Sequence, residues 1–242
     1  MRILAYIYYL ITSLRNFLYD KRILPIRRVE GVEIICIGNI TVGGTGKTPA
    51  VQYFVKRLQK MGRKVAVVSR GYRGKRKREP LLVSDGYEIF ATARESGDEP
   101  FIHALNLKVP IVVSSNRYKG CMFAKKHFGV DTIVIDNRFQ HRKLYRDRDI
   151  VLIDATNPFG WGEVLPKGML REDFKKGARR ASEFIITKSD LVSEREVERI
   201  KKYLKKKLGK EAAKVVGKFK KNKTVAVAKI DPQNFRFSKP EE

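Results

Sequence analysis

The chain has 242 residues, 43% of them hydrophobic and 32% charged, a balance that suits a folded α/β domain and excludes disordered and fibrous proteins. Lysines and arginines number 52 against 26 aspartates and glutamates, so the formal net charge is +26. A field of that sign attracts nucleic acid, anionic lipid or phosphorylated substrates, and composition alone does not choose among them.

The N-terminal segment is an apolar run over residues 3–14 that follows Met1-Arg2. No cleavage site of small residues follows it, and it is shorter than the ~20 residues that cross a bilayer. Interleaved tyrosines and the basic residues up to Arg28 suit a helix in a membrane interface. A helix packed on its own domain explains the run equally well. We expect residues 1–28 to form a membrane-associating helix with a basic flank.

Alternating strands and helices are predicted for the rest of the chain, with one core over residues 29–228 and a short tail over 229–242. The clearest helix covers residues 48–61, and a second covers 193–208 and opens with a capping box of Ser193 and Glu196. This order predicts a mostly parallel sheet covered on both faces. The predicted strands are residues 32–37, 64–68, 110–113, 132–135, 150–153, 183–187 and 224–228.

A glycine-rich segment joins the first predicted strand to the helix at 48–61. Such a loop binds the phosphates of a nucleoside triphosphate through backbone N–H groups and the helix N-terminus. Its lysine would reach the β- and γ-phosphates, and the threonine after it would bind Mg²⁺. The strict motif has glycine where this chain has Thr41. The predicted phosphate-binding residues are Thr41, Val42, Gly43, Gly44, Thr45, Gly46, Lys47 and Thr48.

A metal-organising acid is expected at the end of a neighbouring strand. Asp136 follows the predicted strand 132–135 and is preferred for this role because of the motif that comes after it. Asp154, which follows residues 150–153, is the rival, and a strand-terminal aspartate can also cap a helix.

Beyond Asp136 the chain resembles the tetraacyldisaccharide 4′-kinases of lipid A biosynthesis, membrane-associated enzymes that phosphorylate a lipid A precursor with ATP. Five motifs occur in the family's order up to about Lys188. The family also accepts Ser or Thr at the position of Thr41. The matching segments are Gly38 to Pro49, Ser69-Arg70-Gly71-Tyr72, Gly97-Asp98-Glu99-Pro100, Phe139-Gln140-His141-Arg142, and Leu165-Pro166 with Leu170-Arg171-Glu172.

The resemblance implies a P-loop NTPase-like three-layer α/β fold, ATP and Mg²⁺ as cofactors, and transfer of phosphate to the 4′-hydroxyl of a tetraacyldisaccharide 1-phosphate. The family's proton-accepting Asp maps to Asp98, which helix capping would otherwise explain, and Lys47 is the second catalytic residue. Glu172 would bind Mg²⁺ and Arg171 would clamp phosphate, although an exposed ion pair explains both. Further substrate-contacting residues are Asn39, Arg70, Tyr72, Gln140 and His141.

The same resemblance predicts an anionic glycolipid as substrate and a peripheral location on the cytoplasmic side of the inner membrane. Nucleic acid is not expected as a partner, because no RNA- or DNA-binding motif accompanies the basic residues. We expect the basic run at residues 199–223 to be a solvated helix face.

The chain departs from the family pattern in three ways. Asn137 and Arg138 stand where the family has Asp and Gly, which predicts a weaker metal site. The family also continues into a smaller C-terminal domain with a histidine that assists the catalytic Asp, whereas no histidine follows His141. We expect ATP–Mg²⁺ binding but slow or absent transfer by the chain alone, either because it is a damaged relative or because a separate C-terminal domain polypeptide completes it.

Two other functions remain open. Thr187-Lys188-Ser189-Asp190 has the Thr-Lys-x-Asp form with which GTPases bind guanine, although four residues are a weak signal and Asp190 could cap a helix. Alternatively, the chain is a non-catalytic, nucleotide-binding basic adaptor at the membrane surface.

Overall fold

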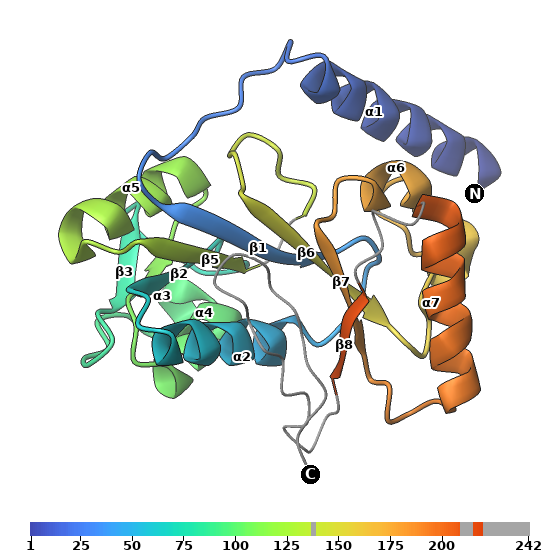
Figure 1. Ribbon diagram of the computed structural model, residues 1–242. Coiled ribbons are helices and arrows are strands. Elements are labelled where there is room, and N and C mark those ends of the chain that lie inside the picture. Colours follow the sequence, from blue (N-terminus) through green and yellow to red (C-terminus); the bar gives the residue numbers. More distant parts are fainter. Residues whose placement is uncertain (137–138, 209–214, 220–242) are drawn as a thin grey trace. The chain divides into compact units, whose positions relative to one another are not determined.

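The computed structural model describes residues 1–136, 139–208 and 215–219 (Figure 1). The chain forms two compact units, each built from separate segments of the sequence. Unit 1 contains Met1–Ile23, Gly38–Gly46 and Arg148–Glu242, and unit 2 contains Leu24–Ile37 and Lys47–Asp147. The chain therefore changes unit near the end of its first strand and again at the end of the predicted phosphate loop.

Unit 2 is a five-stranded sheet with helices on both faces. The strand order is β3-β4-β2-β5-β1, and neighbouring strands are parallel except for the antiparallel pair β3–β4. Helix α5 covers one face, while α2 and α4 cover the other (Figure 1). The three-layer arrangement predicted from the sequence is confirmed here. The elements are β1 (Glu33–Asn39), α2 (Lys47–Lys60), β2 (Val65–Ser69), β3 (Leu81–Ser84), α3 (Ala93–Ser96), α4 (Asp98–Asn106), β4 (Ile111–Val113), α5 (Arg117–Phe128) and β5 (Thr132–Asp136).

The core of unit 2 follows from strands that are apolar on both faces. Ile34 and Cys36 of β1 share a cluster with Cys121 and Ala124 of α5, and the alternate residue Ile35 is completely buried as well. Strands of a parallel sheet are covered twice, so their sequences are apolar throughout. The two cysteines are buried free thiols, as their apolar surroundings predict, and burial raises the pKa of Cys121 to about 12.

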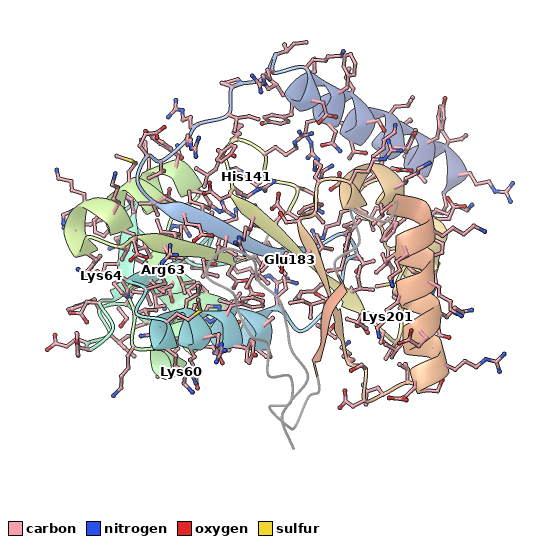
Figure 2. All side chains as sticks on the ribbon, viewed as in Figure 1. Lys60, Arg63, Lys64, His141, Glu183 and Lys201 are labelled. Atoms are coloured by element: carbon pink, nitrogen blue, oxygen red, sulfur yellow. The ribbon has the colours of Figure 1, made fainter. Side chains whose placement is uncertain are left out.

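The basic segment after α2 holds the starts of two strands together. Arg63, labelled with Lys60 and Lys64 in Figure 2, donates from Nη2 to Glu33 Oε2 and from Nε to Asp131 Oδ1, both at 2.9 Å. One guanidinium thereby bridges the first residue of β1 and the residue just before β5. This pairing fixes the register of the two adjacent strands at their N-terminal ends.

Unit 1 contains the parallel strands β6, β7 and β8 in that order. One of the two hydrogen bonds of the capping box predicted at the start of α7 is present, from the Glu196 N–H to Ser193 Oγ at 3.3 Å. Val197, Ile200 and Leu204 form the buried face of α7. The elements are α1 (Arg2–Asp20), β6 (Arg148–Asp154), the 3-10 helix η1 (Gly160–Gly162), α6 (Phe174–Ala178), β7 (Glu183–Thr187), α7 (Glu194–Leu208) and β8 (Val215–Phe219).

The two strands that the sequence does not predict are β3 and β8. Strand β3 has four residues and lies antiparallel on the edge of its sheet, and β8 contains Gly217, which weakens the strand pattern. The predicted strand at 224–228 and the predicted tail at 229–242 lie outside the described residues, and the boundary after residue 28 stays a prediction.

Helix α1 has an inverted distribution of polar and apolar side chains. Its buried residues include Thr12 and Asn16, together with Ala5 and Tyr19. Its large apolar side chains are between 47% and 76% exposed: Ile3, Leu4, Tyr6, Ile7, Leu10, Ile11, Leu14 and Phe17. No helix in the described part of the chain has the length and hydrophobicity to span a bilayer.

Candidate functional site

The predicted phosphate loop connects β1 to α2 and turns at two glycines. Gly43 and Gly46 have φ angles of +111° and +77°, which residues other than glycine rarely adopt. Gly43 and Gly44 are exposed, whereas Lys47, the first residue of α2, is only 9% exposed. An exposed glycine backbone followed by a helix N-terminus is the arrangement that binds phosphate.

Polar contacts within unit 1 hold the loop in place. Asn39 donates from Nδ2 to the Thr41 carbonyl at 2.6 Å, and Arg171 donates to the same carbonyl from Nε at 3.3 Å. Thr187 of β7 donates from Oγ1 to the Thr45 carbonyl at 3.0 Å. Asn39 and Arg171 therefore support the loop backbone, and the substrate contacts predicted for them stay predictions.

Asp98 is not the N-cap residue of α4, so helix capping does not explain its presence. Gly97 is the N-cap of α4, with a φ of +89°, and no side chain makes a cap hydrogen bond there. Asp98 occupies the first turn with its side chain exposed, where the helix dipole favours a carboxylate. The position suits a group that must accept a proton from a substrate hydroxyl.

Two motifs from distant parts of the sequence pack directly against each other in unit 2. A Cβ atom added to Gly71 would lie 2.3 Å from the Ser96 carbonyl oxygen, and one added to Gly97 would lie 2.7 Å from the Tyr72 carbonyl oxygen. The Ser-Arg-Gly-Tyr segment and the Gly-Asp-Glu-Pro segment thus meet backbone to backbone. This contact positions the start of α4.

The pKa of Glu99 depends on the charged side chains around the start of α4. Burial is the main cause that raises the pKa of Glu99, the charges of Asp136 and Asp98 raise it further, and Lys47 and His103 oppose the shift. Three predicted site residues, Lys47, Asp98 and Asp136, therefore share one electrostatic environment. Glu99 is not among the residues predicted from the sequence, although its place beside Asp98 in a matched motif is a signal.

Asp136 ends β5 and is completely buried. Its Oδ2 lies 3.0 Å from Nε2 of His103, and its Oδ1 has no hydrogen-bond partner among the described residues. A buried carboxylate oxygen without a hydrogen-bond partner is suited to binding a cation. The Thr48 hydroxyl at the start of α2 is a second oxygen atom that could coordinate Mg²⁺. The neighbouring departures, Asn137 and Arg138, lie outside the described residues.

No group of three or more His, Cys, Asp or Glu residues that could hold a metal occurs in the described ranges. A nucleotide-bound Mg²⁺ needs only one or two carboxylates, because phosphate and water complete its coordination. Asp136 supplies such a carboxylate, and the Thr48 hydroxyl is a further oxygen donor.

The two other acids considered for the metal site have protein partners in unit 1. Asp154 accepts from the Thr156 N–H at 3.0 Å and forms an ion pair with Lys188. Glu172, 1% exposed, accepts from Asn16 Nδ2 at 2.7 Å and from Arg180 Nη2 at 2.8 Å. These contacts favour a structural role for Glu172, and the Mg²⁺ ligation expected for it stays a prediction.

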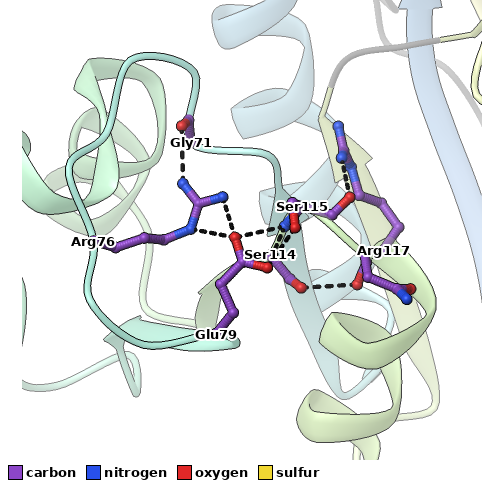
Figure 3. Close-up of polar contacts among 7 residues, drawn as sticks. Gly71, Arg76, Glu79, Ser114, Ser115 and Arg117 are labelled. Atoms are coloured by element: carbon purple, nitrogen blue, oxygen red, sulfur yellow. Dashed lines mark hydrogen bonds and ion pairs between the residues drawn. The ribbon is translucent and has the colours of Figure 1, made fainter.

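Arg117 is the largest completely buried side chain among the described residues, at 2% exposure. Figure 3 shows its Nη1 donating to the Ser115 carbonyl, at 2.8 Å. Its Nε and Nη2 have no hydrogen-bond partner in the described part of the chain. Burial, and then the charge of Arg70, lower the pKa of Arg117 to about 10. The nearby Arg76 differs, because it pairs with Glu79 (Figure 3).

His141 belongs to the same concentration of positive charge. Burial lowers its pKa to about 4, assisted by the charges of Arg117, Arg146, Lys143 and Arg70. The imidazole is therefore neutral at physiological pH. We call the arginines Arg70, Arg117 and Arg146, together with the neutral His141 beside them, the cationic cluster.

The cationic cluster suits an anion with several oxygens, such as a phosphate monoester. It brings together the predicted substrate residues Arg70 and His141. Gln140, which is half-buried, precedes His141 in the chain, and Tyr72 is exposed beside the Arg73 guanidinium. Sequence analysis missed Arg117, whose one signal is its place just after a predicted strand, at the edge where parallel sheets bind ligands.

Unit 1 contains a cavity of about 610 Å³ against α1. Its aromatic wall includes Phe159, whose ring centroid lies 5.1 Å from that of Phe174 and 4.1 Å from that of Tyr203. The charged residues of its lining have both signs, because Glu163, which pairs with Lys167, and Asp173 lie there together with Lys175. Such a cavity suits an apolar group.

Comparison with known proteins decides the family. The model of the family described as tetraacyldisaccharide-1-P 4′-kinase, or LpxK, matches residues 1–238. The chain belongs to this family.

Curated tetraacyldisaccharide 4′-kinases are similar to it in sequence. The Halothermothrix orenii protein is 42% identical over 203 residues, which are 83% of this chain and 52% of the relative. The Geobacter sulfurreducens protein is 40% identical over 187 residues, which are 76% and 52%. The chain spans about half the length of the curated relatives that it matches.

A solved LpxK from Aquifex aeolicus, described as the "apo" form in complex with ATP, has a similar structure. It is 38% identical, with a TM-score of 0.71 over 78% of this chain and 58% of that structure. The predicted α/β P-loop fold is thereby confirmed. Of the residues predicted from the sequence, Lys47, Asp98 and Asp136 lie in unit 2, which also contains the cationic cluster, and Asn39, Arg171 and Glu172 lie in unit 1.

Proposed function

We propose that the chain is the nucleotide-binding part of a tetraacyldisaccharide 4′-kinase. In this role it binds ATP and Mg²⁺ and takes part in phosphoryl transfer to the 4′-hydroxyl of a tetraacyldisaccharide 1-phosphate. The observation that carries the proposal is the shared environment of Lys47, Asp98 and Asp136 around Glu99, in the unit that also contains the cationic cluster. Family membership supports the same reaction.

Each residue has a role that its surroundings support. Phosphoryl transfer depends mainly on positioning and on neutralising phosphate charge. Lys47 begins a helix directly after the glycine loop and would contact the β- and γ-phosphates of ATP. Asp136 Oδ1 and the Thr48 hydroxyl would hold Mg²⁺, which when bound neutralises phosphate oxygens. Asp98, exposed in the first turn of α4, would accept the proton of the attacking hydroxyl.

The cationic cluster would bind an anionic group of the glycolipid. Arg117 supports this assignment best, because two of its buried nitrogens lack partners in the described part of the chain. A phosphate in that position would accept charge-assisted hydrogen bonds from these two nitrogens, which have no acceptor among the described residues.

The properties of α1 and the net charge support the proposed membrane location. A helix that buries threonine and asparagine and exposes leucine and isoleucine fits an apolar surrounding better than water. The formal charge of +26 would attract anionic headgroups. We therefore place the protein peripherally on the cytoplasmic side of the inner membrane, where its lipid substrate is accessible.

A transfer assay tests the proposal. The purified chain is incubated with γ-labelled ATP, Mg²⁺ and tetraacyldisaccharide 1-phosphate, with and without the C-terminal half of a full-length relative supplied as a separate polypeptide. We expect ATP binding in both cases, slow or absent transfer by the chain alone, and faster transfer with the added half. Asp98→Asn should abolish transfer and preserve ATP binding, whereas Glu88→Gln, an exposed acid of the same unit, should change neither.

Two results would count against the proposal. Absence of ATP binding would remove its basis, and rapid transfer by the chain alone would remove the need for a C-terminal polypeptide. Retention on anionic vesicles with no transfer under any condition would favour the non-catalytic adaptor.

Guanine binding is the second candidate. The contact from Thr187 to the Thr45 carbonyl brings the Thr-Lys-x-Asp segment next to the phosphate loop within unit 1, where a base-binding segment belongs. Lys188, however, is paired with Asp154. A binding titration in which GTP competes with ATP tests this alternative, and tighter binding of GTP than of ATP would establish it.

A further inference from the structure

A buried histidine on α4 contacts the predicted metal ligand. Nε2 of His103 lies 3.0 Å from Oδ2 of Asp136, and both side chains are 0% exposed. A carboxylate that binds a cation is ionised and can only accept hydrogen bonds, so in the role considered for Asp136 the hydrogen of this contact belongs to Nε2. The sequence analysis gave His103 no role, because its partner is 33 residues away in the chain.

The contact makes the two oxygens of Asp136 different. Oδ2 is held by the imidazole, while Oδ1 is buried with no hydrogen-bond partner among the described residues. A buried carboxylate oxygen in this state destabilises the fold unless something binds it. Among the described residues, one oxygen of Asp136 is thus held by a hydrogen bond and the other has no partner.

Helix α4 links this pair to the rest of the proposed site. Glu99 and His103 are four residues apart and lie on the same side of the helix. The pKa of Glu99 is raised mainly by burial and then by Asp136, and it is lowered by Lys47 and His103. One helix therefore carries the predicted proton acceptor, Asp98, in its first turn and the partner of the predicted metal ligand one turn later.

We propose that His103 is a positioning residue whose Nε2–H holds Oδ2 of Asp136 so that Oδ1 faces the Mg²⁺ ion of a bound nucleotide. The inference rests on the proposed function, because it requires a nucleotide-bound cation. Residues that orient a metal ligand through a hydrogen bond typically change metal affinity by about 10–100-fold when they are replaced. Leucine at position 103 cannot donate, glutamine can donate from its terminal amide, and asparagine is one methylene shorter.

Nucleotide affinity with and without metal tests the role. The affinity for ADP is measured by calorimetry in Mg²⁺ and in EDTA for the unchanged chain, His103→Leu, His103→Gln and the control His127→Leu. His127 is the matched control, because it lies on α5 of the same unit and stacks on Phe123. We expect His103→Leu to reduce the Mg²⁺-dependent gain in affinity about 10-fold or more and to leave affinity in EDTA unchanged. His103→Gln should restore most of the gain, and His127→Leu should match the unchanged chain.

Several outcomes would overturn the inference. A normal Mg²⁺-dependent gain in His103→Leu would do so, as would an equal loss of affinity in Mg²⁺ and in EDTA. If His103→Leu does not fold by circular dichroism, His103→Gln is compared with His103→Asn, and an equal gain in both would refute a role for the donor's position. An unchanged chain that binds ADP without any gain from Mg²⁺ also refutes it, whereas a chain that binds no ADP refutes the proposed function itself.

Discussion

The guanidinium of Arg117 carries a positive charge where water does not reach it. Removing an unpaired charge from water destabilises a fold, and proteins retain such groups mainly at sites that bind the opposite charge. The neighbouring positive charges of Arg70 and Arg76 increase the cost, as the lowered pKa of Arg117 indicates. The residue is better explained by a ligand than by packing.

Replacing Arg117 by methionine should separate function from stability. In transfer assays with the C-terminal half of a relative supplied, we expect Arg117→Met to raise KM for the phosphorylated acceptor by about 10-fold or more, because charged hydrogen bonds contribute about 1.5–3 kcal/mol each. The free energy of unfolding in urea should stay level or rise by about 1–4 kcal/mol, because a buried charge becomes a packed apolar side chain. Lys119→Met, on the exposed side of α5, is the control. A loss of stability with normal KM would show that Arg117 is structural.

His141 predicts a pH dependence of stability. Its pKa is about 4 in the folded chain and about 6.5 when unfolded, so the unfolded chain binds more protons between these values. Stability should therefore fall as pH decreases from 6.5 to 4, by an amount on the order of 2 kcal/mol from this residue. His141→Gln should flatten the decrease in urea unfolding curves measured at pH 7 and pH 4.5. Equal slopes in both proteins would contradict the assignment.

Sequence patterns identified the residues of local motifs and missed those that depend on distant neighbours. Lys47 and Asp136 were found because a glycine loop and a strand end mark them within a few residues. Arg117 and His103 were not, because one resembles an exposed arginine at a helix start and the other an ordinary apolar-face histidine. Their roles come from burial and from partners far away in the chain.

At the scale of elements, the close contact between the loop at Gly71 and the start of α4 leaves no room for a side chain. Both Gly71 and Gly97 have positive φ angles, +65° and +89°. Backbone conformation and space therefore require glycine independently, and the contact determines where Asp98 lies.

Gly71→Ala should be strongly destabilising. The added methyl would lie 2.3 Å from the Ser96 carbonyl oxygen, and overpacking together with the left-handed backbone costs about 2–5 kcal/mol. Gly129→Ala is the matched control, because Gly129 has a φ of +58° and nothing within 4 Å of an added Cβ. Its cost should be about 1–2 kcal/mol. Thermal unfolding of the two variants compares them, and equal losses would contradict the packing argument.

The polar face of α1 is the second element whose contacts make a prediction. Asn16→Ala would leave one oxygen of buried Glu172 without its 2.7 Å hydrogen bond. An unsatisfied buried carboxylate oxygen costs about 1–3 kcal/mol, so α1 should detach more often. Hydrogen exchange of the α1 amides should quicken in this variant and stay normal in Leu10→Ala, an exposed position. Unchanged exchange in Asn16→Ala would show that other contacts hold the helix.

Helices and central strands were predictable because their periodicity is local. Helices α2 and α7 follow from regular apolar spacing, and the parallel strands follow from continuous β-branched runs. The grouping of the phosphate loop with residues after 148 was not predictable, because it depends on contacts such as that between Thr187 and Thr45. Nor does periodicity say that α1 turns its apolar side outward.

For the whole molecule, the net charge and α1 together predict binding to anionic membranes. Sedimentation with vesicles of anionic lipid should retain the chain, and retention should decrease as salt rises, because screening weakens the attraction. Combining Ile7→Ser, Ile11→Ser and Leu14→Ser should lower retention by about 10-fold or more, since each removes apolar area from the interface. Leu105→Ser, an exposed leucine of α4, is the control. If retention changed neither with salt nor with these substitutions, binding through charge and the apolar face of α1 would be excluded.

The inverted surface of α1 also bears on how the protein is made. Asn16 precedes its partner Glu172 by 156 residues. At a synthesis rate of about 5–20 residues per second, the helix waits roughly 8–30 s before that partner has been synthesised. During this interval its polar face lacks the partner that it has in the folded chain, whereas its apolar side chains, which stay exposed after folding, would already be available to the lipid surface proposed above. Attachment to the membrane would then begin on the ribosome, before the kinase core has folded.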